Sequence, residues 1–110
     1  MKQGEIWNVN FNPTRGSEQS GFRPALVISG DMMNTYLKVI IVCPLTTKVR
    51  SFKGSLVLDP NAENGLKEQS EVLTFHMRSI AKERFVQRLG KIDKEGIEAV
   101  KSSLNDLLKY

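Results

Sequence analysis

The apolar residues of this chain follow a helical period only near its end. Ile97, Val100 and Leu104 recur at spacings of three and four residues, and Leu107 continues the same stripe of a helix. Asp93 precedes the stripe in the position of an N-cap. Before it, β-branched and aromatic residues form short runs separated by Gly, Pro and Asn. An order of elements in which the strands come first and one helix comes last predicts a mainly β domain, a small barrel with an appended helix.

Six strands are expected before that helix. The most apolar run, 37–43, stops at Pro44, which has no N–H to donate to a ladder. A polar loop at 12–21 follows the first strand, a basic loop at 45–50 follows the third, and a turn at 79–84 precedes the last. The expected strands are 4–11, 23–29, 37–43, 54–58, 71–77 and 85–90, with a helical turn at 30–36 that has Asp31 as its cap.

Length and composition narrow the class of protein. A chain of 110 residues is one domain, spanning 1–110, and 40% hydrophobic with 25% charged residues is typical of a globular protein. No apolar run is long enough to cross a membrane, and the first ten residues lack the apolar core of a signal peptide. We therefore expect a cytoplasmic protein with no membrane partner. One Cys and one His cannot form a disulfide or a zinc site, and neither a metal nor a cofactor is expected.

The positive charge lies in the first half of the sequence. The chain has a net charge of +4, and residues 1–58, with seven basic and three acidic residues, carry all of that excess. Such an asymmetry favours an anionic partner, either nucleic acid or an acidic protein segment, on that half of the molecule.

Three places could carry chemistry. Pro24 restricts Arg23 to an extended conformation, and a fixed guanidinium suits a phosphate; the alternative is a solvated surface arginine. Thr46, Thr47 and Lys48 follow a buried strand, where hydroxyls either contact a ligand or satisfy a turn.

The third place is His76, the single histidine, in the expected strand 71–77. Histidine is the side chain whose unperturbed pKa lies near neutrality, so His76 could act as general acid or base, although a lone histidine on a strand is often structural. Several aromatic residues could stack on unpaired bases or belong to the core: Trp7, Phe11, Phe22, Tyr36, Phe52, Phe75, Phe85 and Tyr110.

Three blocks of sequence resemble one known family. The first runs from Gly4-Glu5-Ile6-Trp7 through Phe11-Asn12-Pro13-Thr14-Arg15-Gly16-Ser17-Glu18-Gln19 to Gly21-Phe22-Arg23-Pro24-Ala25-Leu26-Val27-Ile28. The second is Val42-Cys43-Pro44-Leu45-Thr46-Thr47, and the third is 70–80, with Arg78-Ser79-Ile80. These blocks resemble the MazF/PemK family of toxin endoribonucleases from type II toxin–antitoxin modules, and the resemblance spans nearly the whole chain.

The resemblance implies a fold, an activity and partners. The fold would be an SH3-like barrel of the CcdB/MazF/PemK type with a C-terminal helix, assembled as a two-fold homodimer. Leu104, Leu107 and Leu108, with the strand segment 39–42, are expected to supply the apolar surface of that dimer. The activity would be metal-independent cleavage of single-stranded RNA, leaving 2′,3′-cyclic phosphate and 5′-hydroxyl ends and so inhibiting translation. The partner would be a cognate antitoxin, an acidic segment that covers the basic surface.

The resemblance also implies residue roles. Arg23 matches the family's catalytic arginine, Thr46 its catalytic threonine or serine, and Glu18 a loop glutamate that could accept a proton. The third block departs from the family, because Phe75 and His76 stand where several relatives carry an acidic residue and Gln. His76 could replace that carboxylate as the base or only contact a nucleobase. RNA contacts are expected from Arg15, Ser17, Gln19, Phe22, Thr47, Lys48, Arg50, Lys53 and Arg78.

Two other functions remain open at this stage. A DNA gyrase inhibitor family of the same fold acts by binding a protein, but this chain ends Leu108-Lys109-Tyr110 without the terminal Trp expected there. A non-catalytic RNA-binding module of similar shape is the second alternative. Cleavage of single-stranded RNA in EDTA separates the nuclease from both.

Overall fold

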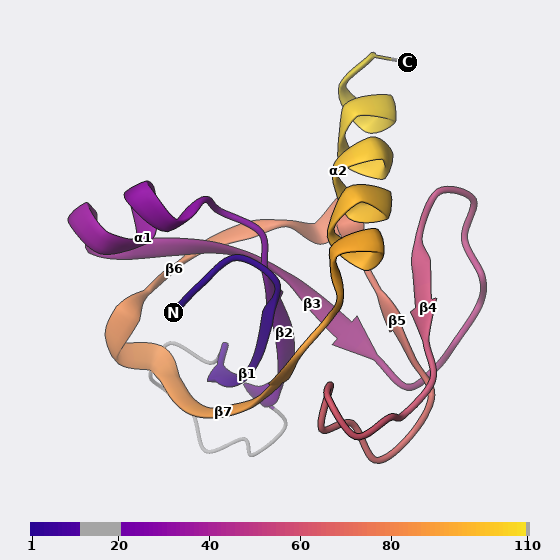
Figure 1. The fold of residues 1–110 in the computed structure, drawn as a ribbon, viewed down its shortest axis with the longest axis horizontal. Helices are drawn as coiled ribbons and strands as arrows, with labels where there is room; N and C mark the ends of the chain where they lie inside the picture. Colours follow the sequence, from indigo (N-terminus) through magenta and orange to yellow (C-terminus); the bar gives the residue numbers. More distant parts are fainter. Residues whose placement is uncertain (12–20, 110) are drawn as a thin grey trace.

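The computed structural model describes residues 1–11 and 21–109 and has one curled antiparallel sheet (Figure 1). The strand order is β4-β5-β3-β2-β1-β7, and β6 also pairs with β3. The strands are β1 (Glu5–Asn10), β2 (Phe22–Val27), β3 (Val39–Thr46), β4 (Leu56–Leu58), β5 (Ser70–Val72), β6 (Arg78–Ala81) and β7 (Phe85–Lys91). The helices are α1 (Asp31–Tyr36) and α2 (Lys94–Lys109), with 3-10 turns η2 (Thr74–His76) and η3 (Lys82–Arg84). The expected mainly β architecture, a small barrel with an appended helix, is confirmed in the form of a half-barrel made by the curled sheet and followed by α2.

The central strands separate two apolar cores. Successive side chains of a strand point to opposite faces, so Leu26 enters one core and its neighbour Val27 the other. The first core is covered by α2 through Val100, and the second is closed by Ile80 of β6 and Phe85 of β7. Each such side chain contributes about 1.5–3 kcal/mol when fully buried. The segment of β2 from Ala25 to Val27 is therefore buried on both faces, as its unbroken apolar run predicts, and it forms a rigid base for Arg23 at the start of the strand.

The C-terminal helix begins where the sequence predicts. The Asp93 carboxylate accepts a hydrogen bond of 2.8 Å from the Gly96 N–H, so Asp93 is the N-cap of α2. The helix stands against one side of the sheet, with the C-terminus at its far end (Figure 1). No helix in the two described stretches is long and apolar enough to cross a membrane.

A carboxylate of β1 ties the first strand to the last one. The Glu5 carboxylate accepts hydrogen bonds from the Trp7 indole N–H (2.9 Å) and the Lys2 N–H (3.0 Å). It also pairs with the Arg88 guanidinium of β7 at 3.1 Å. Partial burial raises the pKa of Glu5, but the bonds from Trp7, Lys2 and Arg88 outweigh that effect and hold the pKa below its usual value. Glu5 thus stabilises the closure of the sheet.

The end predicted for the third strand is wrong, because β3 continues through Pro44 to Thr46. Pro44 lies opposite Ala25 of β2, and its carbonyl accepts a hydrogen bond of 2.9 Å from the Leu73 N–H. In a strand, the N and C=O groups of one residue point to the same side, so the nitrogen of Pro44 points to the side of β3 that pairs with β5 and β6. Pro44 lies between the β5 pairing and the β6 pairing, where the ladder is interrupted, so its missing N–H removes no ladder hydrogen bond. Leu45 and Thr46, expected in a loop, are therefore strand residues.

The strand expected at 71–77 and the turn expected at 79–84 are also wrong. Strand β5 ends at Val72 and is followed by η2, while Arg78–Ala81 form β6. Both β5 and β6 pair with β3, first at Leu45–Thr46 and then at Val39–Val42. Between β5 and β6 the chain moves from pairing with Leu45–Thr46 to pairing with Val39–Val42 of β3, and η2 is the turn that connects the two pairings. His76 consequently lies on a 3-10 turn and not on a strand.

Two further expectations need correction. Asp31 is the first residue of α1 and not its cap, since Gly30 holds that position and the Asp31 carboxylate instead accepts the Gln3 N–H at 2.8 Å. Only part of the strand segment 39–42 can supply apolar surface for a dimer, because Ile40 and Val42 are fully buried in the second core, whereas Val39 and Ile41 are half-buried. Leu107 and Leu108 of α2 are exposed, as that expectation requires.

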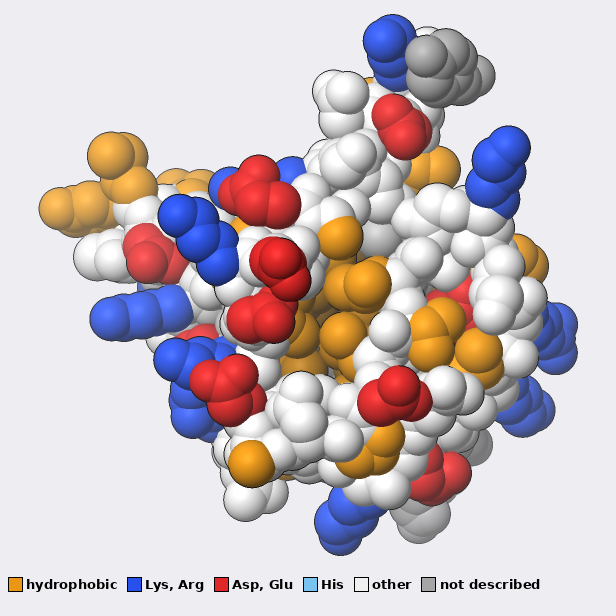
Figure 2. Space-filling model, turned by 45° about the vertical axis from the view of Figure 1, so that its right-hand side comes forward, with side chains coloured by type: hydrophobic (Ala, Val, Ile, Leu, Met, Phe, Trp, Pro, Cys, Tyr) orange, Lys and Arg blue, Asp and Glu red, His pale blue; other side chains and the backbone are white. Residues whose placement is uncertain are grey.

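One face of the molecule, shown in Figure 2, has an apolar hollow. Figure 2 shows hydrophobic side chains gathered near the middle of that face, with acidic side chains along one side. Partly buried residues edge the first core: Ile28, Leu56, Leu58, Leu89, Ile97 and Leu104. The acidic rim distinguishes this face from the cationic site described next.

Candidate active site

Two neighbouring hollows share the side chain of Arg23. The first has a volume of about 460 Å³ and is lined by Phe11, Gly21, Arg23, Pro44, His76, Met77 and Arg78. The second has a volume of about 310 Å³ and is lined by Arg23, Pro24, Leu45, Thr46, Thr47 and Lys48. Both are open and carry positively charged side chains, so together they form a surface suited to an extended anionic chain.

The backbone of β2 fixes the position of Arg23. Arg23 pairs with Val9 and Pro24 with Asn8 of β1, while Ala25 pairs with Pro44 of β3. The proline ring keeps the preceding residue extended, and the buried residues that follow anchor the strand. The Arg23 side chain is exposed, and no carboxylate within residues 1–11 and 21–109 forms an ion pair with it. Its charge is therefore available to a ligand.

Thr46 ends β3 beside Arg23. Its Oγ1 accepts a hydrogen bond of 3.1 Å from the Lys48 N–H, which shapes the turn that carries Thr47 and Lys48. Thr46 is half-buried, whereas Thr47 and Lys48 are exposed. Because the hydroxyl oxygen accepts, its own hydrogen can be donated to a phosphate oxygen in the hollow.

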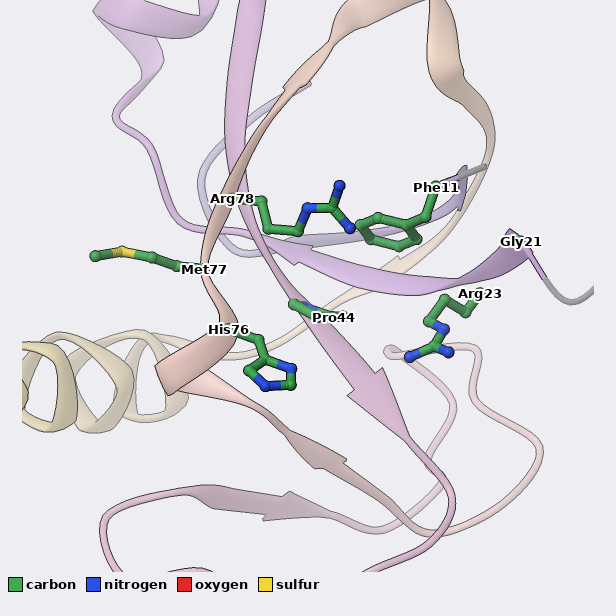
Figure 3. Close-up of a pocket in the computed structure, with 7 residues that line it drawn as sticks. All are labelled: Phe11, Gly21, Arg23, Pro44, His76, Met77 and Arg78. Atoms are coloured by element: carbon green, nitrogen blue, oxygen red, sulfur yellow. The ribbon is translucent and has the colours of Figure 1, made fainter. Parts of the chain in front are cut away.

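His76 and Arg23 approach the first hollow from different elements. In Figure 3 the imidazole of His76 and the guanidinium of Arg23 project into the same space on either side of Pro44, whereas Met77 points away. The His76 ring contacts the Phe75 ring with centroids 4.5 Å apart and planes at 69°. No carboxylate of the described residues lines either hollow, so His76 is the proton acceptor that this part of the chain offers there.

A second arginine lies over an aromatic ring at the far side of the first hollow. The guanidinium carbon of Arg78 is 5.1 Å from the centroid of Phe11 (Figure 3). A cation–π contact of this kind contributes about 0.5–1 kcal/mol at an exposed site and orients the charge. Arg78 and Arg23 thus place two cations on one cavity.

A buried carboxylate lies behind the site. Glu71 of β5 is fully buried opposite Thr46, and it accepts hydrogen bonds from the N–H groups of Arg50 (2.8 Å), Ser51 (3.1 Å) and Phe52 (2.8 Å) and from the Ser55 hydroxyl. Burial raises the pKa of Glu71, but these donors outweigh burial and hold the pKa below its usual value. Glu71 is an anion at neutral pH, fully engaged by its own chain.

The structure groups some of the predicted site residues and separates others. Arg23, Thr46, Thr47 and Lys48 line one hollow, while Arg23, His76 and Arg78 line the other. Phe22, Arg50 and Lys53 line neither, and Lys53 borders a separate hollow beside α2. The predictions for Arg15, Ser17, Glu18 and Gln19 lie outside the described residues.

Sequence reasoning missed Glu71 and the roles of Phe11 and Pro44 in the cavity wall. Glu71 begins the expected strand 71–77, directly before Val72 and Leu73, but nothing in the sequence indicates its donors, which lie about twenty residues earlier. Cys43 is buried, and burial raises the pKa of its thiol to about 12. Among the described residues, no group of three His, Cys, Asp or Glu side chains could hold a metal ion.

Comparisons with known proteins agree on one family. Residues 2–108 match the family described as PemK-like, MazF-like toxin of type II toxin-antitoxin system. Endoribonuclease MazF9 of Mycobacterium tuberculosis is 35% identical over 97 residues, which cover 84% of this chain and 82% of the relative. Endoribonuclease toxin MazF of Escherichia coli (strain K12) is 33% identical over 103 residues, which cover 94% of this chain and 88% of the relative. A crystal structure of MazE-MazF from Deinococcus radiodurans (Form-II) has a TM-score of 0.82 at 29% identity, covering 99% of this chain and 96% of that chain.

Proposed function

The chain belongs to the family of PemK-like, MazF-like toxins of type II toxin–antitoxin systems, and we propose that it cleaves single-stranded RNA at the two hollows that share Arg23. The observation that carries this proposal is the placement of an exposed arginine, free of ion pairs to the described residues, between a threonine hydroxyl and an imidazole. Relatives at 33–35% identity are named as endoribonucleases, which fixes the class of reaction.

The reaction is a transesterification that needs no metal ion. The 2′-oxygen of the RNA attacks the adjacent phosphorus, the P–O5′ bond breaks, and the products are a 2′,3′-cyclic phosphate and a 5′-hydroxyl. One proton leaves the 2′-hydroxyl and one is delivered to the 5′-oxygen, so a base and an acid are needed. The phosphorane carries extra negative charge, which fixed cations stabilise more strongly than they stabilise the ground state.

Each residue has a role in that scheme. Arg23 binds the non-bridging phosphate oxygens and stabilises the phosphorane, and the Thr46 hydroxyl donates to the same phosphate from the neighbouring hollow. His76 accepts the proton of the 2′-hydroxyl from the opposite side of the first hollow. Arg78, Thr47 and Lys48 hold flanking phosphates. Glu18, from the first sequence block, is a further proton-transfer residue in this proposal.

The antitoxin uses the same cations as the RNA. Lys48, Arg50 and Lys53 are exposed, and within the described residues none forms an ion pair. An acidic antitoxin segment neutralises them as RNA phosphates do, so the two ligands compete. RNA binding should also weaken with salt, with a slope of about 0.7 per phosphate contact for a single strand. A solved structure at 29% identity is titled as a MazE-MazF complex, which supports a protein partner of this kind.

Assembly and location complete the proposal. The protein is a homodimer in the cytoplasm, where its RNA substrate is found. Leu107 and Leu108 are 47% and 78% exposed, which leaves apolar surface at the end of α2 for a second copy. A monomer mass at micromolar concentration would contradict the dimer.

The test is digestion of a mixed single-stranded RNA in EDTA, with chemical identification of the new ends. The proposal expects 2′,3′-cyclic phosphate and 5′-hydroxyl ends from the wild type, and cleavage that is slower by about 10²-fold or more in Arg23→Ala. Intact RNA with the wild type would reject the proposal and favour a toxin that acts by binding alone. Cleavage that leaves 5′-phosphate ends would reject the proposed transesterification.

A further inference from the structure

Exposed aromatic rings continue the first hollow beyond His76. Phe52, in the loop between β3 and β4, meets Phe75 of η2 edge-to-face, with centroids 5.2 Å apart and planes at 79°. Phe75 in turn contacts His76, which lines the hollow. Phe52 and Phe75 are 43% and 46% exposed, although they touch each other. A row of rings therefore leads from the cavity to the solvent, and much of the surface of Phe52 and Phe75 is exposed to the solvent.

Buried groups hold the loop that carries Phe52. Glu71 accepts the N–H groups of Arg50, Ser51 and Phe52 in succession, and Ser51 has a positive φ of 53°, which turns the chain around the carboxylate. The Ser103 hydroxyl of α2 donates to the Gly54 carbonyl at the other end of the loop and also bonds Thr74 of η2 at 3.1 Å. The loop and η2 are thus fixed to each other and to the sheet.

We propose that Phe52 and Phe75 form a subsite that stacks an unpaired base of single-stranded RNA beside the Arg23 cavity, and that Glu71 is the positioning residue that holds this subsite in place. This inference rests on the proposed function for the identity of the ligand. A base has an apolar face that gains from contact with an exposed ring, and such stacking tolerates any base.

The surrounding charge favours this ligand over a protein side chain. Arg50 and Lys53, on either side of Phe52 in the same loop, are exposed cations that can meet the phosphates next to a stacked base. Glu71 does not contact those phosphates, because it is fully buried and its oxygens accept hydrogen bonds from the loop. Anchoring also lowers the ordering cost of binding, since the ring is held in place before the RNA arrives.

The test measures RNA binding apart from RNA cleavage. A short RNA with 2′-O-methyl sugars, which has no attacking hydroxyl, carries the fluorescent base 2-aminopurine, and its affinity and emission are measured by titration. Phe52→Ala should weaken binding about tenfold and reduce the quenching that reports stacking. Phe52→Tyr should restore both. Tyr36→Ala, which removes an exposed ring on α1 distant from the site in sequence and fold, should bind like the wild type.

Glu71→Gln should reproduce the Phe52→Ala defect, and the double variant should bind no worse than either single variant, because both changes remove the same stacked ring. Thermal unfolding checks that each variant folds; if Glu71→Gln does not, Ser55→Ala, which removes a single donor to Glu71, replaces it. Wild-type binding by Phe52→Ala, or additive losses in the double variant, would overturn the inference. Because the probe cannot be cleaved, a failure of the proposed reaction leaves these readings unchanged.

Discussion

Two walls of the site are built in different ways. The strand wall, Arg23 and Thr46, stands on β2 and β3, which pair with strands on both sides and are anchored by buried residues such as Leu26 and Cys43. The turn wall, Phe52 and Phe75, stands on a loop and a 3-10 turn that are held by hydrogen bonds to the side chains of Glu71 and Ser103. The strand wall carries the charge of Arg23 on paired strands. The turn wall carries the exposed rings on segments that have fewer backbone hydrogen bonds. The difference suggests that the strand wall serves chemistry and the turn wall serves substrate binding, with His76 at the junction.

The largest expected effect is on the strand wall. Arg23→Ala should lower the single-turnover cleavage rate by about 10²- to 10³-fold, as the loss of a donor to a developing oxyanion does. Stability should not change, because the side chain is exposed and forms no ion pair with the described residues. Rapid-quench cleavage assays and thermal unfolding measure the two quantities. A folded Arg23→Ala protein with normal activity contradicts the assignment.

The next effect tests the junction between the walls. His76→Ala should lower the cleavage rate by about 10²-fold, because a general base is lost. His76→Phe keeps a ring against Phe75 but cannot accept a proton, and it should be equally slow while binding the uncleavable RNA normally. If His76→Phe cleaves at the wild-type rate, His76 contacts a nucleobase only, and the base lies elsewhere.

A smaller effect is expected from the hydroxyl of the strand wall. Thr46→Val should slow cleavage about tenfold, which corresponds to one hydrogen bond of about 1.4 kcal/mol. The Lys48 N–H loses its acceptor but lies in an exposed turn, where water replaces it. Thr47→Val is the matched control, because Thr47 is a neighbouring hydroxyl that the proposal uses only for flanking contacts. Equal losses of cleavage rate in Thr46→Val and Thr47→Val would contradict a catalytic role that is specific to Thr46.

The smallest effect concerns acid and the turn wall. The pKa of Glu71 and that of Glu5 are both held below the usual 4.5, so both carboxylates stabilise the fold fully above that pH and lose this effect as the pH falls through the lowered values. From neutral to acidic pH, urea unfolding should show a smaller fall in the free energy of unfolding in Glu71→Gln and in Glu5→Gln than in the wild type. Only Glu71→Gln should also weaken RNA binding. Equal acid sensitivity in all three proteins would show that neither carboxylate has a lowered pKa.

The sequence predicts the strand wall better than the turn wall, for a physical reason. The apolar runs of β1, β2 and β3 and the capped stripe of α2 depend on local periodicity, and Pro24 acts on its neighbour Arg23, so these features can be inferred residue by residue. The motif that matches a known family reinforces the same elements. The sequence therefore predicts Arg23 and Thr46 as candidate site residues, and both line one hollow.

The turn wall depends on contacts that local patterns do not contain. The step of the chain from β5 to β6 follows from a break in the ladder of β3 some thirty residues away, and the sequence alone predicts one continuous strand there. The anchor of Phe52 is a buried carboxylate whose donors are mostly main-chain N–H groups, which every residue except proline has. Only the fold shows which of them converge.

The central claim, chemistry at the strand wall and binding at the turn wall, is tested most directly by single-turnover cleavage of one RNA over a series of enzyme concentrations. Arg23→Ala should remain at least about 10²-fold slower than the wild type at saturating enzyme, because it lacks transition-state stabilisation. Phe52→Ala should need about tenfold more enzyme but reach the wild-type rate, because it lacks only binding. Recovery of the Arg23→Ala rate at saturation, or a Phe52→Ala rate that stays low there, would contradict the account.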